Sequence, residues 1–209
     1  MDLTSLLQSQ LSEGMIDQLS QQLGGASKEQ TQTAAAGIMN VLMGAMARNA
    51  ATPQGAQALN NALERDHDGS VLDNVMDLLG GGGSRSVSNV NERALNGSGI
   101  LNHILGSRQS GAVDMISQMS GLNQNQTGSL MATLAPIVMG MLGKAKSENN
   151  LDAGGVAGIL EGFTRQQQGS NPAMGIISGF LDQDGDGSIV DDVANIGMKM
   201  LGGLFKKRR

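Results

Sequence analysis

The chain has 209 residues, a formal net charge of −5 and a hydrophobic share of 39% that includes 14 Met and 3 Phe but neither Trp nor Tyr. It contains no Cys, which excludes disulfides, thiolate metal sites and cysteine nucleophiles. The net negative charge argues against nucleic acid as the main partner, because phosphate binding depends on clustered Lys and Arg.

The first residues of the sequence bear on where the protein resides. Met1–Ser5 lack the basic region and the cleavage pattern of a secretory signal peptide. No apolar run in the sequence approaches the roughly 18 residues that a membrane span needs. We therefore expect a cytoplasmic protein without a transmembrane segment, with a dedicated secretion route as the alternative.

Two segments of the sequence resemble each other. Residues 16–48 align without gaps with residues 112–144, and apolar positions agree along both segments. An internal duplication is the simplest explanation of this match. The identical pairs are Gln22 with Gln118, Gly25 with Gly121, Thr31 with Thr127, Ala36 with Ala132, Met43 with Met139 and Gly44 with Gly140.

Each of these segments predicts a helix, a tight turn and a second, more buried helix. In the first segment, Gly24 and Gly25 end an apolar stripe, and Ser27 with Gln30 forms a capping box. The run Ala34–Ala47 is apolar on nearly every face. Such a run is typical of a helix at the centre of a fold.

The second segment repeats this pattern. Asn123 with Gln126 predicts the same capping box before the apolar run Leu130–Leu142. Pro136 lies inside that run and predicts a kink or an early break of the helix, because proline lacks the amide hydrogen that helical bonding needs.

Both segments have the spacing of a helix-turn-helix, in which the second helix would present basic or amide side chains to DNA. Lys28 is the only basic residue at the start of the second helix in the first segment, and no basic residue opens the corresponding helix of the second. We therefore favour helix packing over DNA reading as the explanation of this spacing.

An acidic loop is predicted after the first hairpin. Alternating acidic side chains, then a glycine and a β-branched residue, match the first half of an EF-hand-like or dockerin-like calcium loop. A structural acidic turn is the alternative, and His67, at a non-ligand position, is expected to be a solvated loop residue. The candidate ligands are Glu64, Asp66, Asp68, Ser70 and Asp73.

Glycine and serine are prominent in the next stretch, residues 80–99, which predicts a flexible linker. Ile100–Leu105 then predicts a short helix that begins the second half. The chain is thus divided into a first helical half at 1–79 with its acidic loop at 64–74, the linker, and a second helical half at 100–209.

A second acidic loop, residues 182–192, carries five carboxylates in eleven residues. Their mutual repulsion would be relieved by a divalent cation, and the pattern predicts calcium binding. The closing carboxylates come one or two residues early for a standard loop, and an acidic turn that caps a helix is the alternative. The candidate ligands are Asp182, Asp184, Asp186, Ser188, Asp191 and Asp192.

The chain ends on a basic cluster, Lys206–Arg209, that follows several apolar residues. This tail could dock on an anionic membrane surface. A solvated chain end is the alternative.

Three motifs taken together resemble a bacterial family of unknown function that includes the YidB-like proteins, the domain of unknown function 937. The motifs are Leu181–Val193, Gly99–Gly106 and Leu134–Gly140. The resemblance implies a small all-helical fold with a homeodomain-like helix arrangement. No reaction is established for the family, so the resemblance implies no catalytic residue.

We therefore expect an all-α protein made of two related helical halves built on helix-turn-helix-like hairpins. With two histidines and neither Cys nor Tyr, the sequence offers little for catalysis, and we do not expect an enzyme. The predicted function is a structural or protein-interaction module that binds calcium, and the sequence does not identify its protein partner. The alternatives are a helix-turn-helix nucleic-acid binder and a peripheral membrane protein.

Overall fold

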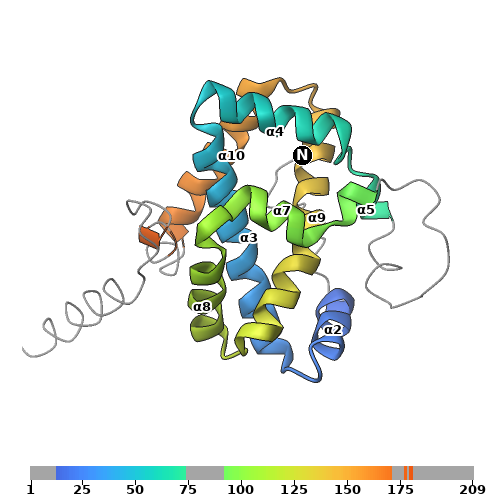
Figure 1. Ribbon diagram of the computed structural model, residues 1–209, viewed down its shortest axis with the longest axis vertical. Coiled ribbons are helices and arrows are strands. Elements are labelled where there is room, and N and C mark those ends of the chain that lie inside the picture. The colour runs from blue at the N-terminus through green and yellow to red at the C-terminus, as the bar shows by residue number, and fades with distance from the viewer. Residues whose placement is uncertain (1–12, 74–91, 171–176, 178, 181–209) are drawn as a thin grey trace, which may run out of the picture.

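The computed structural model describes residues 13–73, 92–170, 177, 179 and 180, and within these ranges the chain forms helices and no strand (Figure 1). The fold is therefore all-α, as predicted. In chain order the helices are α2 (Glu13–Gln22), α3 (Lys28–Ala50), α4 (Pro53–Arg65), α5 (Ser70–Asp73), η1 (Glu92–Leu95), α7 (Gly97–Leu105), η2 (Gly106–Arg108), α8 (Gln109–Ser120), α9 (Gln124–Glu148) and α10 (Ala153–Ser170).

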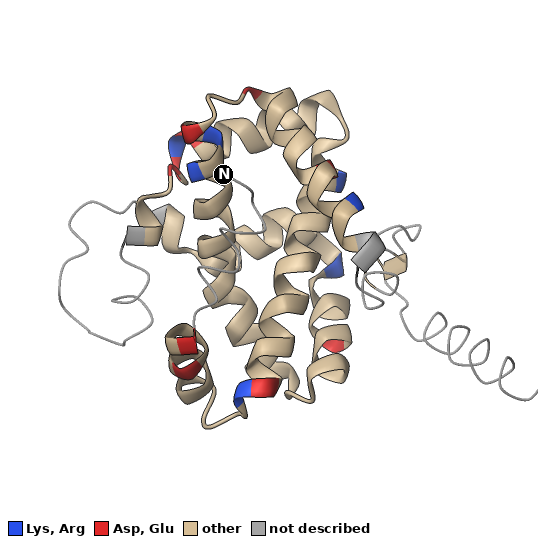
Figure 2. Cartoon of the chain, turned by 180° about the vertical axis from the view of Figure 1, so that it is seen from behind, with Lys and Arg blue, Asp and Glu red and all other residues tan. Residues whose placement is uncertain are grey.

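The two longest helices, α3 and α9, lie at the centre and pack against each other (Figure 1). Fourteen residues of each are buried, which confirms the prediction that these are the innermost helices. Helices α4, α7, α8 and α10 pack around α3, and α2 covers its first half. Charged residues lie near the ends of the central helices, whose middles carry none (Figure 2).

The capping boxes form at the starts of both central helices, as predicted. Ser27 Oγ accepts a hydrogen bond from the Gln30 amide at 3.2 Å, and Gln30 Oε1 accepts one from the Ser27 amide at 3.2 Å. Asn123 and Gln126 make the same pair of bonds before α9, at 2.9 and 3.1 Å. Each box satisfies amide groups that a helix start leaves without partners.

The two hairpins are joined by a reciprocal pair of hydrogen bonds. Gln30 Nε2 donates to the carbonyl of Gly121 in the turn of the second hairpin, at 3.0 Å. Gln126 Nε2 donates to the carbonyl of Leu23 near the turn of the first hairpin, at 2.7 Å. One hydrophobic core extends through helices of both halves, so they are not separate globular bodies.

Pro136 does not break α9, contrary to one of the predicted alternatives. The helix continues through it to Glu148. Proline leaves the carbonyl four residues earlier, that of Ala132, without its helical amide donor. Helix α7 begins directly against this carbonyl, because a Cβ added at Gly97 would lie only 1.8 Å from the Ala132 oxygen.

The predicted linker at 80–99 extends too far toward the C-terminus. Residues 92–95 form η1, and Gly97 begins α7, whose cap is Asn96. Asn96 Oδ1 accepts a hydrogen bond from the Gly99 amide at 2.9 Å, which fixes the first turn of the helix. Residues 80–91 lie outside the described part of the chain.

Within the described residues, α9 alone is long and apolar enough to cross a membrane by length and composition. The central helix of a globular core meets the same criterion. In the structure 72% of this apolar stretch is buried inside the protein. We therefore assign α9 as a core helix.

Candidate functional site

The upstream acidic loop connects α4 to α5 and lies on the surface of α9. Two glycines of α9 allow this close approach. A Cβ added at Gly143 would lie 1.6 Å from the His67 carbonyl oxygen, and one added at Gly140 would contact Leu72 at 3.5 Å. Gly69 turns the loop with a φ of +100°, which only glycine adopts readily.

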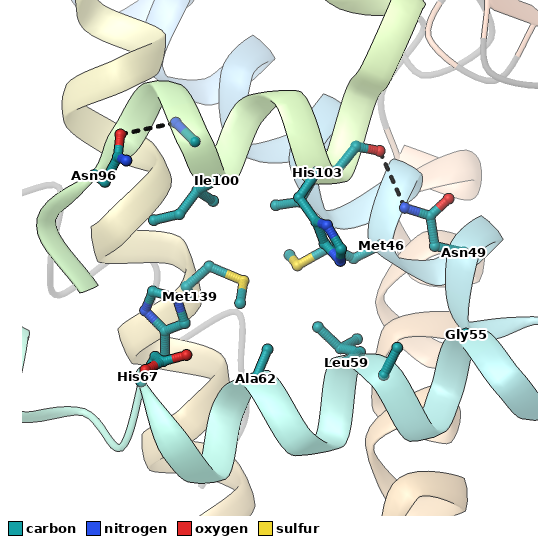
Figure 3. Close-up of a pocket in the computed structure, with 14 residues that line it drawn as sticks. Met46, Asn49, Gly55, Leu59, Ala62, His67, Asn96, Ile100, His103 and Met139 are labelled. Carbon is teal, nitrogen blue, oxygen red and sulfur yellow. Dashed lines mark hydrogen bonds between the residues drawn. The ribbon is translucent and has the colours of Figure 1, made fainter. Parts of the chain in front are cut away.

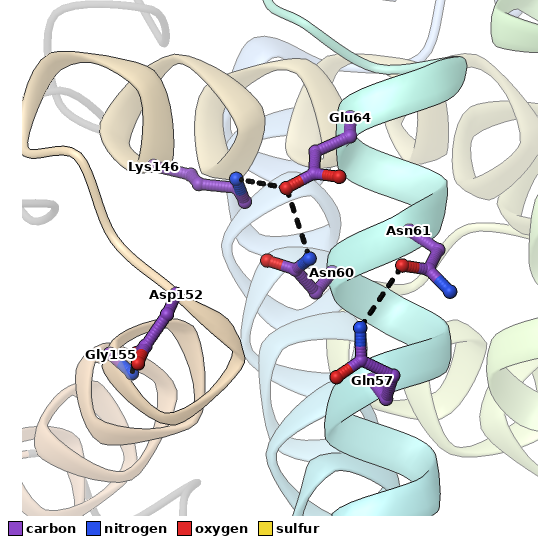
Figure 4. Close-up of polar contacts among 7 residues, drawn as sticks. All are labelled: Gln57, Asn60, Asn61, Glu64, Lys146, Asp152 and Gly155. Atoms are coloured by element: carbon purple, nitrogen blue, oxygen red, sulfur yellow. Dashed lines mark hydrogen bonds and ion pairs between the residues drawn. The ribbon is translucent and has the colours of Figure 1, made fainter.

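The first candidate ligand of this loop, Glu64, is bound to other protein groups. Its Oε1 accepts hydrogen bonds from Lys146 Nζ on α9 at 2.9 Å and from Asn60 Nδ2 on α4 at 3.1 Å (Figure 4). The Lys146 ammonium, followed by Asn60, lowers the pKa of Glu64 from its ordinary value. Glu64 thus links the end of α4 to α9.

Asp68 makes a local turn just before α5 in this structure. Its Oδ1 accepts a hydrogen bond from the Ser70 amide, the first residue of α5, at 3.0 Å. This backbone hydrogen bond lowers the pKa of the Asp68 carboxyl. Such a bond is what the alternative of a structural acidic turn predicts.

The described residues bring no three His, Cys, Asp or Glu side chains together in a group that could hold a metal ion. Of the upstream set, Glu64, Asp66, Asp68 and Ser70 lie in the described part, and nothing is described of the Asp73 side chain. The downstream candidates at 182–192 lie outside the described residues, as does the basic tail at 206–209.

His67 is buried rather than solvated, contrary to prediction. Only 5% of its surface is exposed, because the loop is seated on the glycines of α9. Its Nδ1 atom is buried and has no hydrogen-bond partner. Burial lowers the pKa of His67 from its ordinary value, against the opposing charges of Asp66 and Asp68.

A cavity of about 620 Å³ lies beside this histidine, between α3, α4, α7 and α9 (Figure 3). Its walls are mostly apolar and include Met46 of α3, Leu59 of α4, Ile100 of α7 and Met139 of α9. The volume and the apolar lining are typical of small-molecule sites.

Both histidines of the chain line this cavity, His67 from the loop after α4 and His103 from α7. Figure 3 shows their rings on different walls, with His67 near Met139 and His103 near Met46. No signal in the sequence indicates that these two residues line the same cavity. They do so because α4, which precedes the His67 loop, and α7, which carries His103, lie on opposite sides of the cavity.

The two asparagines of the cavity wall hydrogen-bond to the wall itself. Asn49 Nδ2 donates to the Ile104 carbonyl at 3.0 Å, and Asn96 Oδ1 caps α7. Asp66 is the only carboxylate in the lining, which contains no Lys or Arg. His67 also lines the cavity, but its Nδ1 atom is itself buried and has no hydrogen-bond partner.

The residues that would face DNA in a helix-turn-helix are engaged within the protein. Lys28, in the first turn of α3, forms an ion pair with Asp17 of α2. The Asp17 carboxylate raises the pKa of the Lys28 ammonium, first through this hydrogen bond. Gln30 and Gln126 make the reciprocal bonds between the two hairpins.

Comparison with known proteins identifies the family. A family model described as bacterial protein of unknown function (DUF937) matches residues 5–145. The chain belongs to this family. The matched region contains the upstream acidic loop and most of the cavity-bearing helices, whereas residues 182–192 lie beyond it. No curated protein and no solved structure matches the chain.

Proposed function

We propose that this DUF937 protein is a non-enzymatic structural or protein-interaction module. The supporting observation is the use of Gln30 and Gln126 to join the two hairpins. In a DNA-reading helix-turn-helix, side chains at the start of the second helix point toward base edges. Here the corresponding side chains hold the protein together, and the body of each second helix is enclosed in the core.

The symmetry of these bonds also supports an internal duplication. Gln30 and Gln126 occupy equivalent positions of the two aligned segments, and each reaches the turn of the other hairpin. The glycines Gly25 and Gly121 occupy equivalent places with φ values of +84° and +76°. A duplicated hairpin that pairs with its own copy gives a compact scaffold for presenting a surface to a partner.

Duplex DNA binding tests this proposal against the nucleic-acid alternative. We expect no mobility shift at low micromolar protein and near-physiological salt, because phosphate contacts need clustered basic residues. Any association at low salt should disappear when residues 206–209 are deleted. Salt-resistant binding of a particular duplex by the deleted protein would contradict the proposal. Binding of the intact protein to anionic vesicles, lost in the same deletion, would support the membrane alternative.

We further propose that the loop at 182–192 binds calcium and stabilises the module. The support is chemical: carboxylates at alternating positions before a glycine offer the oxygen ligands that calcium prefers, and without a cation they repel one another. A cation that binds only the folded state adds about 2.7 kcal/mol to its stability at a hundredfold excess over the dissociation constant.

Thermal unfolding with calcium and with chelator tests this site. We expect a higher midpoint in calcium, and we expect Asp184→Ala to abolish the difference. Asp68→Ala is the matched control in the upstream loop and should retain the response to calcium. Equal midpoints of the unaltered protein at millimolar calcium would exclude a stabilising site.

A further inference from the structure

The two acidic loops are copies of one sequence motif. Residues 63–73 align without gaps with residues 181–191, and six of the eleven positions are identical. The internal duplication therefore includes the loops as well as the two hairpins. The identical pairs are Leu63 with Leu181, Asp66 with Asp184, Asp68 with Asp186, Gly69 with Gly187, Ser70 with Ser188 and Asp73 with Asp191, and the apolar pair Val71 and Leu72 corresponds to Ile189 and Val190.

The upstream copy shows how this motif docks on a helix. A Cβ added at Gly140 of α9 would lie 3.5 Å from Leu72 Cγ and 3.7 Å from Val71 Cβ, which are ordinary contact distances. Only 1% of the surface of Val71 is exposed. The apolar pair that follows the loop glycine thus packs directly on a glycine of a central helix.

Helix α3 has an equivalent glycine. The alignment of the two hairpins pairs Gly44 with Gly140, and Gly44 is buried. The chain also returns to the core just before the second loop, because α10 packs against α3, Ile177 is fully buried in the core and Phe180 packs against it. In Figure 1 the described residues at 177–180, drawn in red, lie on the opposite side of the α3–α9 pair from α5.

We propose that the second loop docks on α3 in the same way, with Ile189 and Val190 packed on Gly44. Docking removes both apolar side chains from water, which the hydrophobic effect favours. The occupant is the protein's own chain because Ile189 follows Phe180 by only nine residues, which span at most about 32 Å. A segment on so short a tether has an effective concentration in the millimolar range, and this favours it over a free partner.

The two docking surfaces differ at one charged position. On α9, Lys146 Nζ binds Glu64, the first carboxylate of the upstream loop, at 2.9 Å (Figure 4). The residue of α3 that aligns with Lys146 by the offset of the hairpins is Ala50, so no lysine occupies the corresponding place for Asp182. A carboxylate that lacks a lysine partner remains available to a cation. This step rests on the proposed calcium site, and it favours the downstream loop over the upstream one as that site.

Nuclear Overhauser spectroscopy on the full chain tests the docking. The Hα protons of Gly44 should show contacts with the methyl groups of Ile189 or Val190, in calcium and in chelator alike, because apolar packing holds the loop in place. The same spectrum contains its positive control, the contact of Gly140 with the methyl groups of Val71.

Two variants localise the contact. Ile189→Ser should shift the signals of Gly44 and leave those of Gly140 in place, and Val71→Ser should do the opposite, because each removes the apolar contact of one surface. Ile189→Ser alters neither central helix, so the helical circular dichroism should be retained. If Val71→Ser unfolds the protein, the Gly140 contact of the unaltered chain remains the control.

Different results would overturn the docking and the calcium site. Absence of the Gly44 contact beside an observed Gly140 contact would overturn the docking, even if calcium raises the thermal midpoint and so supports the calcium site. A Gly44 contact without any calcium effect supports the docking and removes only the calcium site. Contacts of Gly44 with residues 1–12 instead, or with Ile189 only across differently labelled chains in a mixed sample, would assign the surface to another occupant and overturn the proposal.

Discussion

At the scale of single residues, a glycine on one helix determines the environment of a histidine on another segment. His67 lies between two aspartates, so its neighbours in sequence indicate a solvated side chain. Its burial depends on the backbone contact between its own carbonyl and Gly143 of α9. The resulting desolvation lowers the pKa of His67, which favours the neutral imidazole at neutral pH.

We predict that Gly143→Ala destabilises the protein. The added Cβ would lie 1.6 Å from the His67 carbonyl oxygen, a backbone atom that cannot rotate away. Forced repacking of this kind typically costs about 1–3 kcal/mol. The loss should appear as a lower midpoint in urea denaturation, and the signals of His67 should shift because its loop is displaced.

Gly128→Ala is the matched control in the same helix. A Cβ at Gly128 would meet nothing within 4 Å, so alanine should stabilise α9 by up to about 1 kcal/mol through its higher helix propensity. If both variants changed the urea midpoint in the same direction and by a similar amount, the contact between the loop and α9 would not be important for stability.

At the scale of elements, the features that depend on the type and spacing of nearby residues were predicted correctly from the sequence. Both capping boxes and the burial of the two central helices followed from residue type and spacing, and the structure confirms them. The early break at Pro136, one of the two predicted alternatives, was wrong: α9 continues to Glu148, and α7 packs against the freed Ala132 carbonyl through Gly97. The linker was also predicted to be too long. Residues 92–99 belong to helices because Ala94 is buried in the protein and Asn96 caps α7, although this stretch of the sequence is polar and contains glycine.

The cavity could not have been predicted from the sequence. Its walls come from four helices, and helical periodicity indicates which face of a helix is apolar without indicating which other helix that face meets. His67 and His103 line the same cavity only through the arrangement of α4 and α7 around α9.

At the scale of the whole molecule, the described parts of the two halves pack against each other around one core. Helix α3 of the first half packs against α8, α9 and α10 of the second half, and one hydrophobic core extends through all of them. Lys146 of the second half also pairs with Glu64 of the first. Separating the halves would expose the apolar faces of both central helices to water, which the hydrophobic effect strongly opposes.

We predict a single cooperative unfolding transition for the full chain. Met43 of α3 and Met139 of α9 are both nearly inaccessible to solvent, with 1% and 4% of their surfaces exposed, and they report on the two halves separately. Their methyl signals should disappear at the same urea concentration, coincident with the loss of helical circular dichroism, as two-state unfolding requires. Two separate midpoints, with one methyl signal persisting after the other is lost, would show that each half is stable without the other and that the shared core contributes little to the fold.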